Sequence, residues 1–91
     1  MGGVVEIKKL RILNLHGLHL REAARIVTIA KKFSSKVHLW YKTVKVDARS
    51  ILDVVLLEAP QNSEVTLTVE GPDEKEAMAA ISQTFQDGGG I

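Results

Sequence analysis

Two kinds of hydrophobic spacing alternate along the chain, and together they predict seven elements of secondary structure. Alternating apolar and polar residues indicate half-buried strands, most clearly where Val65, Leu67 and Val69 stand between polar neighbours. Apolar residues three or four positions apart indicate helices with one buried face. The predicted elements are a strand at about 6–13, a helix at 20–33, strands at 36–41 and 44–48, a short helix at 51–57, a strand at 64–70 and a helix from about 73.

The order of these elements, β-α-β-β-α-β-α, predicts an α+β sandwich in which the helices pack most simply on one face of a sheet. A chain of 91 residues is long enough for one modest hydrophobic core but not for two. We therefore expect a single domain over residues 1–91, with its core at about 6–86 and a flexible glycine-rich tail at 88–91.

Polar residues with capping potential precede two of the predicted helices. Ser50 and Asp53 have the Ser-x-x-acid spacing of a helix start, although Asp fits the reciprocal cap less well than Glu. Asp73 and Glu76 form an Asp-x-x-Glu start for the last helix. Both pairs predict where their helices begin.

Charge balance and composition argue against several classes of protein. A net charge of +1, with scattered basic residues, argues against a chain built mainly to hold nucleic acid or an anionic membrane. The absence of cysteine excludes disulfides and thiolate metal sites. No run approaches the roughly 20 apolar residues of a membrane span, and the start of the chain lacks the apolar region of a signal peptide. We expect a cytoplasmic domain without membrane insertion.

The chain has three histidines, His16, His19 and His38, which are the first candidates for chemistry. Their spacing matches no familiar metal-ligand pattern, and we expect neither a metal nor another cofactor. His38 falls on an alternating strand and is expected to point to solvent from a sheet face. The sequence also lacks a glycine-rich phosphate loop and a Gly-x-Ser-x-Gly nucleophile elbow.

His19 stands at the predicted N-cap of the first helix, directly after a turn at Gly17. Unpaired backbone N–H groups and the positive end of the helix dipole favour an anion there. An imidazole can attack phosphorus and hold a phosphoryl group, and Arg21 would add a charged donor. From these residues alone, plain helix capping by His19 is the favoured interpretation, and phosphoryl transfer is the alternative.

Three stretches in order along the chain are similar to the landmarks of a known family. Gly-Leu-His-x-Arg-x-Ala-Ala at 17–24 resembles the active-centre signature Gly-Leu-His-x-Arg-Pro-Ala of HPr, the histidine-containing phosphocarrier of the bacterial phosphoenolpyruvate-dependent sugar phosphotransferase system. Arg-Ser-Ile-Leu at 49–52 resembles the family's second landmark. The stretch at 65–74 resembles its last strand and the Glu-Gly-x-Asp-Glu start of the final helix. The resemblance covers roughly residues 6–86.

The resemblance implies an open-faced β-sandwich, with a four-stranded antiparallel sheet and three helices on one face. It implies that His19 accepts a phosphoryl group on Nδ1 (the pros nitrogen) from phospho-enzyme I and passes it to an enzyme IIA component. Arg21 would steady the phosphate. Such a protein is a carrier that forms a phosphohistidine intermediate, rather than a free-standing enzyme.

The resemblance also assigns a docking surface and a regulatory site. Leu20, Ala24, Ile51 and Leu52 would form the apolar surface that contacts partner proteins. Ser50 matches the serine that HPr kinase/phosphorylase modifies in many bacteria, and a phosphate is well tolerated at a helix N-cap. We expect the protein to be a monomer.

Three departures from the family signature lie beside His19. Leu20 directly follows the histidine, Glu22 replaces the family's proline, and His16 stands where a small polar residue is usual. Glu22 is three residues after the predicted N-cap, so its carboxylate is placed to accept from the His19 backbone N–H. That contact favours the helix, whereas a carboxylate near a phosphoryl group opposes its negative charge. His16 and Glu22 are both expected to modulate the site.

These observations support two main function hypotheses. The first is a phosphocarrier that relays phosphoryl groups through His19. The second is a regulatory binding module on the same scaffold, controlled through Ser50, with little phosphoryl flux. An RNA-binding domain is a weaker third reading, because Trp40 and Tyr41 point to opposite faces of their strand and cannot form a paired stacking platform.

Overall fold

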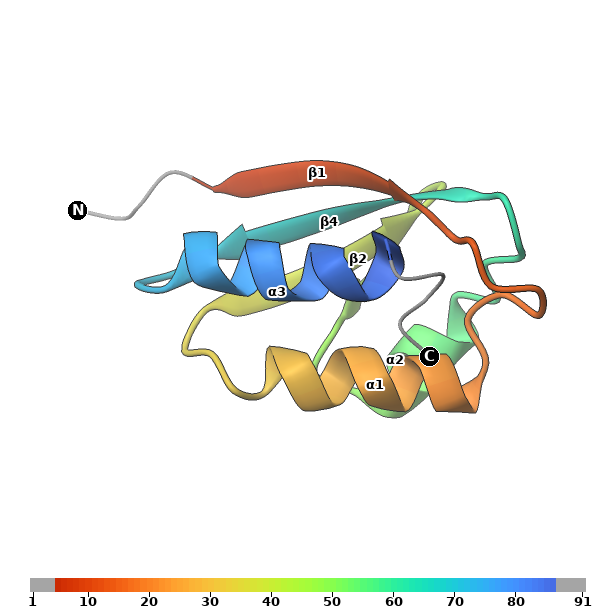
Figure 1. Cartoon of the computed structure of the whole chain (residues 1–91), viewed down its shortest axis with the longest axis horizontal. Coiled ribbons are helices and arrows are strands. Elements are labelled where there is room, and N and C mark those ends of the chain that lie inside the picture. The colour runs from red at the N-terminus through yellow and green to blue at the C-terminus, as the bar shows by residue number, and fades with distance from the viewer. Residues whose placement is uncertain (1–4, 87–91) are drawn as a thin grey trace.

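A computed structural model of the chain describes residues 5–86. Its elements follow the predicted order (Figure 1). In sequence they are β1 (Glu6–Arg11), α1 (Leu20–Ala30), β2 (Lys36–Tyr41), β3 (Val44–Asp47), α2 (Ile51–Leu56), β4 (Glu64–Glu70) and α3 (Glu74–Gln86). The tail expected at 88–91 lies outside the described residues.

The four strands form one antiparallel sheet in the order β1-β4-β2-β3. In this register Leu10 lies opposite Val65, and Leu39 lies opposite Leu67. Alternation therefore places one row of apolar side chains on a single face, where all are at most 6 % exposed. The row comprises Leu10, Val37, Leu39, Val65, Leu67 and Val69.

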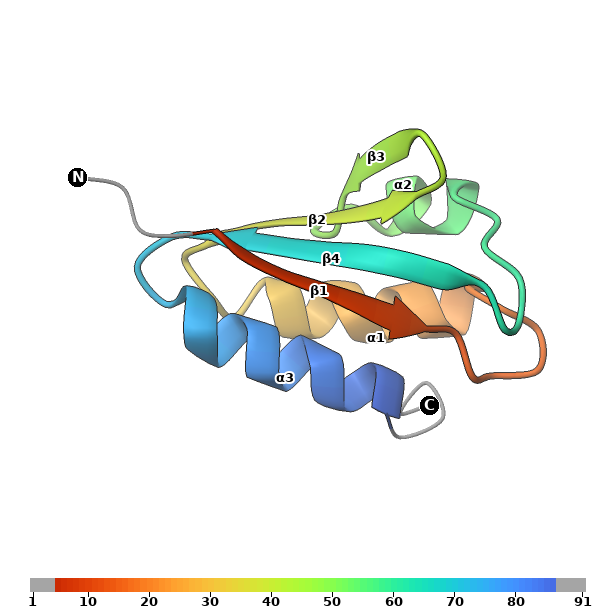
Figure 2. The same ribbon diagram turned by 90° about the horizontal axis from the view of Figure 1, so that it is seen from above.

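All helices lie against this apolar side, and the opposite face of the sheet is open, as Figure 2 shows for α1 and α3. Helix α1 buries Ala23, Ile26, Val27 and Ala30, while α3 contributes Ala77, Ile81 and Phe85 to the same core. The short helix α2 packs beside α1 and β3. The predicted open-faced α+β sandwich, with three helices on one face of a four-stranded antiparallel sheet, is confirmed.

The first strand and the first helix are shorter than predicted. Pairing of β1 ends at Arg11 because its partner β4 begins at Glu64. Helix α1 ends at Ala30, and Phe33 then donates its N–H to the carbonyl only three residues back. The turn that ends at Phe33 is therefore tighter than a turn of α-helix. The helical spacing of apolar residues continues through this turn, which is why the sequence predicts a longer helix.

The expected Asp-x-x-Glu pair at the start of α3 is wrong in its details. The helix begins where predicted, but the carboxylate of Asp73 accepts from the Ser34 N–H at 2.8 Å and the Ser35 hydroxyl at 2.5 Å. These bonds, the Ser35 bond foremost, lower the pKa of Asp73. Glu74 rather than Glu76 reaches back, accepting from the Gly71 N–H at 3.0 Å. Asp73 therefore ties the α1–β2 connection to α3.

Candidate functional site

The loop between β1 and α1 is held at both of its ends. Ile12 is buried and donates its N–H to the Ser63 carbonyl at 3.0 Å. Leu18 is buried as well and donates to the Ala59 carbonyl at 3.0 Å. These anchors fix the segment that leads into α1 against the connection between α2 and β4.

Gly17 makes the close approach of these two segments possible. Its φ of +74° lies in the left-handed region, which side chains rarely adopt. A Cβ at this position would lie 2.4 Å from the Ala59 carbonyl oxygen. The glycine of the Gly-Leu-His stretch is therefore required by the backbone on which the histidine stands.

His19 is the N-cap of α1, as predicted, with extended backbone angles (φ −87°, ψ −179°). Its own N–H is engaged by the Gly17 carbonyl at 3.1 Å and by Glu22 Oε1 at 3.2 Å. The predicted reach of Glu22 back to His19 is thus confirmed, and Glu22 is only 8 % exposed. The N–H groups of residues 20 and 21 have no carbonyl one turn back within the helix, which leaves donors at this end.

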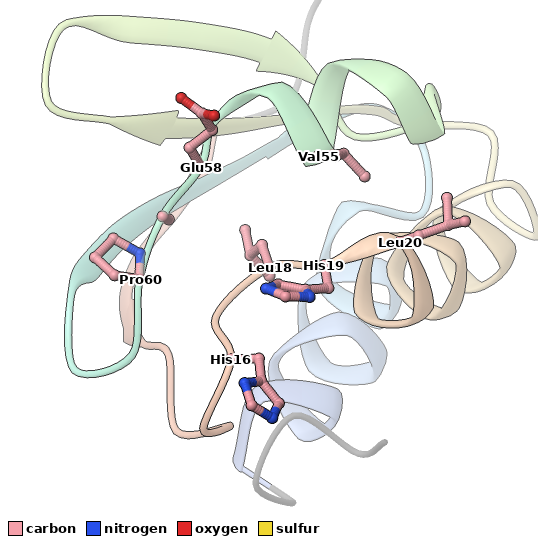
Figure 3. Close-up of a pocket in the computed structure, with 8 residues that line it drawn as sticks. His16, Leu18, His19, Leu20, Val55, Glu58 and Pro60 are labelled. Atoms are coloured by element: carbon pink, nitrogen blue, oxygen red, sulfur yellow. The ribbon is translucent and has the colours of Figure 1, made fainter.

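The exposed His19 imidazole lies in a hollow of about 410 Å³ on the surface. Figure 3 shows His16 beside His19 on one side of this hollow, with Glu58 and Pro60 across from them. The ring centroids of the two histidines are 5.6 Å apart, with their planes tilted by 41°. Residues from the loop before α1 and from the end of α2 line the rest: Leu18, Leu20, Val55 and Ala59.

Arg21 lies next to His19 in sequence but does not line the hollow. Its side chain is exposed, and within residues 5–86 it has no hydrogen-bond or ion-pair partner. A guanidinium in this condition is available to an anion without first breaking another contact.

Helix α2 runs back towards the N-terminus of α1. Before α2, Arg49 donates to the Phe33 carbonyl beyond the far end of α1. After α2, Ala59 accepts from Leu18 near His19. The chain direction therefore brings the last turn of α2 close to the candidate site.

The four residues predicted for docking lie on α1 and α2, and three of them are large and exposed. Leu20 is 64 %, Leu52 is 71 % and Ile51 is 38 % exposed, while Ala24 is half-buried. Sequence reasoning missed Leu56, which is 70 % exposed one turn after Leu52. Its helical spacing from Leu52 was the available signal.

Ser50 is the N-cap of α2, as predicted, and its hydroxyl accepts from the Asp53 N–H at 3.4 Å. The Ser50 N–H donates to the Asp47 carbonyl at 3.1 Å rather than to the Asp53 carboxylate. Because Ser50 is at the start of α2 and the His19 hollow is at its end, the two predicted sites lie at opposite ends of this helix.

The remaining histidine is on the open face of the sheet. His38 is half-buried there, opposite Thr68 on β4 and Asp47 on β3. Burial, and then the nearby Lys45 ammonium, lower the pKa of His38. The three histidines therefore do not converge on one site, and residues 5–86 contain no cluster of three or more potential metal ligands.

The described residues also contain no helix long and apolar enough to cross a bilayer.

Trp40 and Tyr41 differ in environment as expected from strand alternation. The Trp40 indole donates to Thr68 on the open face at 3.1 Å, whereas Tyr41 packs against the hydrophobic core.

Comparison with known proteins places this site in context. The family model for the PTS HPr component phosphorylation site matches residues 7–87. The phosphocarrier protein HPr of Treponema pallidum is 46 % identical over 81 residues, which is 89 % of this chain and 92 % of that protein. Other curated relatives from Buchnera, Cupriavidus and Xylella bear the same name.

Solved structures agree with the sequence relatives. The crystal structure of HPr-C-His from Thermoanaerobacter tengcongensis superposes with a TM-score of 0.89 at 36 % identity, covering 94 % of this chain and 97 % of that one. Crh, the catabolite repression HPr of Bacillus subtilis, superposes with a TM-score of 0.70 at 33 % identity, covering 90 % and 95 %.

Proposed function

The chain belongs to the HPr family of phosphocarrier proteins of the phosphotransferase system, and from this premise we propose a route for its phosphoryl group. In this route Nδ1 of His19 accepts the phosphoryl group from phospho-enzyme I and passes it to an enzyme IIA component. The observation that carries the proposal is the exposed His19 imidazole directly before the first turn of α1, where the N–H groups of residues 20 and 21 have no carbonyl one turn back in the helix.

The geometry suits a reversible phosphoryl carrier. The Nδ1 lone pair forms the bond to phosphorus as the bond between phosphorus and the donor breaks, and delivery to the acceptor reverses the exchange. The N–H groups of residues 20 and 21 and the positive end of the helix dipole favour the transferred negative charge. Arg21, which has no competing partner among the described residues, supplies a charged donor to the phosphate.

Partner proteins would dock on the apolar surface beside the site. Leu20, Ile51 and Leu52 expose large side chains on neighbouring helices, and the half-buried Ala24 lies one turn after Leu20 on α1. Leu56 extends this surface along α2 towards the His19 hollow. An apolar surface next to the reacting atom lets one face serve both phosphoryl donor and acceptor in turn. The protein would act as a cytoplasmic monomer.

The route is tested by incubation with enzyme I and labelled phosphoenolpyruvate, beside the variants His19→Ala and Glu22→Pro. We expect acid-labile label in the wild type and transfer of that label to enzyme IIA. We expect no acid-labile label in His19→Ala. Label that survives in His19→Ala refutes the site. An unlabelled wild type beside a labelled Glu22→Pro would instead favour a regulatory module with little phosphoryl flux.

Ser50 is proposed as a second, regulatory phosphorylation site. At the N-cap of α2 a phosphate would face the donors of the first helical turn, although Asp53 adds negative charge nearby. Treatment with HPr kinase/phosphorylase should produce acid-stable phosphate that disappears in Ser50→Ala. Persistence of that phosphate in Ser50→Ala would show that another residue is modified.

A purely regulatory role is not the favoured alternative. The curated relatives named above are called phosphocarrier proteins. Crh, whose name refers to catabolite repression, superposes on this chain less closely than HPr-C-His does. The chain also keeps a histidine and an arginine at the two polar positions of its Gly-Leu-His-x-Arg stretch.

A further inference from the structure

We propose that His16 is a second phosphoryl-binding residue, which donates a hydrogen bond to an oxygen of the phosphoryl group carried by His19. The inference rests on the proposed function of His19 and adds a positioning residue to that site. His16 forms no bond to phosphorus and holds the group only through its N–H.

The backbone holds His16 beside His19. The turn from Asn14 to Gly17 is closed by a bond from the Gly17 N–H to the Asn14 carbonyl at 3.1 Å, and the Asn14 side-chain amide donates to the Gly17 carbonyl. Leu18 then ties the end of this turn to Ala59. His16 therefore stands on an anchored turn rather than on a free loop.

The spacing of the two rings leaves room for a phosphoryl group at their edges. Their centroids are 5.6 Å apart and both side chains line the same hollow, as Figure 3 shows. A charged hydrogen bond from an imidazole nitrogen to a phosphoryl oxygen spans about 2.7–2.9 Å. The inference requires the exposed His16 side chain to turn about its χ angles until one ring nitrogen reaches that distance.

His16 has a donor to offer in every protonation state. A neutral imidazole keeps one N–H, and an imidazolium has two. Within residues 5–86 the His16 ring has no hydrogen-bond partner, so its donor is not already committed. A phosphoryl group has oxygen acceptors on all sides, which makes it a suitable partner.

The charges around the hollow explain why a second donor matters in this chain. Glu58 lines the hollow from the connection after α2, and Glu22 lies at the first turn of α1 behind the His19 N–H. The Glu22 carboxylate opposes the negative charge of a phosphoryl group on His19. A second N–H donor at His16 offsets part of that opposition.

The test uses the full chain phosphorylated by enzyme I and phosphoenolpyruvate, with wild type, His16→Ala and His16→Gln compared. His38→Gln, which changes a histidine on the open sheet face, is the matched control. The share of phosphorylated protein at equilibrium with enzyme I is measured for each protein under the same conditions. Melting temperatures of all four proteins verify that they fold.

We expect His16→Ala to shift this equilibrium towards phospho-enzyme I by about threefold to tenfold. His16→Gln should recover part of the loss, because its side-chain amide also donates a hydrogen bond. The imidazole resonances of His16 should shift on phosphorylation in the wild type, a readout that does not depend on any variant.

An equilibrium that is equal in wild type and His16→Ala, together with unmoved His16 resonances, overturns the inference while the His19 route stands. Phosphorus bound to His16 itself also overturns it. A wild type that is not phosphorylated at all refutes both the route and the inference.

Discussion

Replacing Glu22 with glutamine tests how this chain tolerates an acidic residue where the family signature has proline. The Glu22 carboxylate accepts from the His19 N–H at 3.2 Å and is almost fully buried. Glutamine keeps an acceptor oxygen of the same reach but removes the charge. The substitution therefore separates the structural role of Glu22 from its electrostatic effect on a phosphoryl group.

The expected magnitude follows from the separation of the charges. With a phosphoryl group on His19, the carboxylate lies about 7 Å from phosphorus, and each charge pair costs about 0.6–2.4 kcal/mol at effective dielectrics between 80 and 20. That free energy corresponds to about threefold to fiftyfold in the phosphorylation equilibrium. Glutamine accepts a weaker hydrogen bond from the His19 N–H than the charged carboxylate does. The substitution should therefore lower the free energy of unfolding by roughly 1 kcal/mol.

The assay measures the share of phosphorylated protein at equilibrium with enzyme I and phosphoenolpyruvate, together with the melting temperature. We expect Glu22→Gln to be more highly phosphorylated than the wild type and to melt a few degrees lower. Glu22→Ala is the control, because it removes the cap as well as the charge. Equal or lower phosphorylation in Glu22→Gln would refute the electrostatic reasoning.

Three further predictions concern stability and docking. Gly17→Ala should cost at least about 1 kcal/mol, because of the left-handed backbone and the clash with a carbonyl, and thermal denaturation should show a fall of at least about 4–8 °C. The lowered pKa of His38 means that the fold prefers its neutral form, so stability falls as pH drops below the ordinary value of 6.5. His38→Gln should reduce the loss of melting temperature between about pH 7.5 and about pH 5.5, and an unchanged loss would contradict this assignment. Leu52→Asp should weaken binding to enzyme I in titration calorimetry with little change in stability, whereas the similarly exposed Ile7→Asp on the open sheet face should leave binding intact.

The fold was predictable where local pattern and tertiary packing agree. The alternation around Val65 and Leu67 specified a strand with one buried face, and its observed bounds match. The cap at Ser50 and the reach of Glu22 to His19 were predictable because both contacts are local, three residues apart.

The rest depended on contacts between distant segments. Asp73 looks like a local helix cap, but its carboxylate is used by Ser34 and Ser35 nearly forty positions earlier in the chain. The pairing of His16 with His19 follows from a turn that no periodicity reveals, and Glu58 reaches the same hollow only because α2 runs back along α1. The sequence pointed to His19 by resemblance, whereas the surroundings of this residue required the structure.

The central claim is that the phosphoryl group is carried by Nδ1 of His19. It is tested most directly by phosphorus–nitrogen coupling in the NMR spectrum of the protein, labelled with ¹⁵N in its histidines and phosphorylated through enzyme I. The account predicts coupling between phosphorus and the Nδ1 resonance of His19, with the nitrogens of His16 and His38 uncoupled. Coupling to either of those histidines, or to Nε2 of His19, would contradict it.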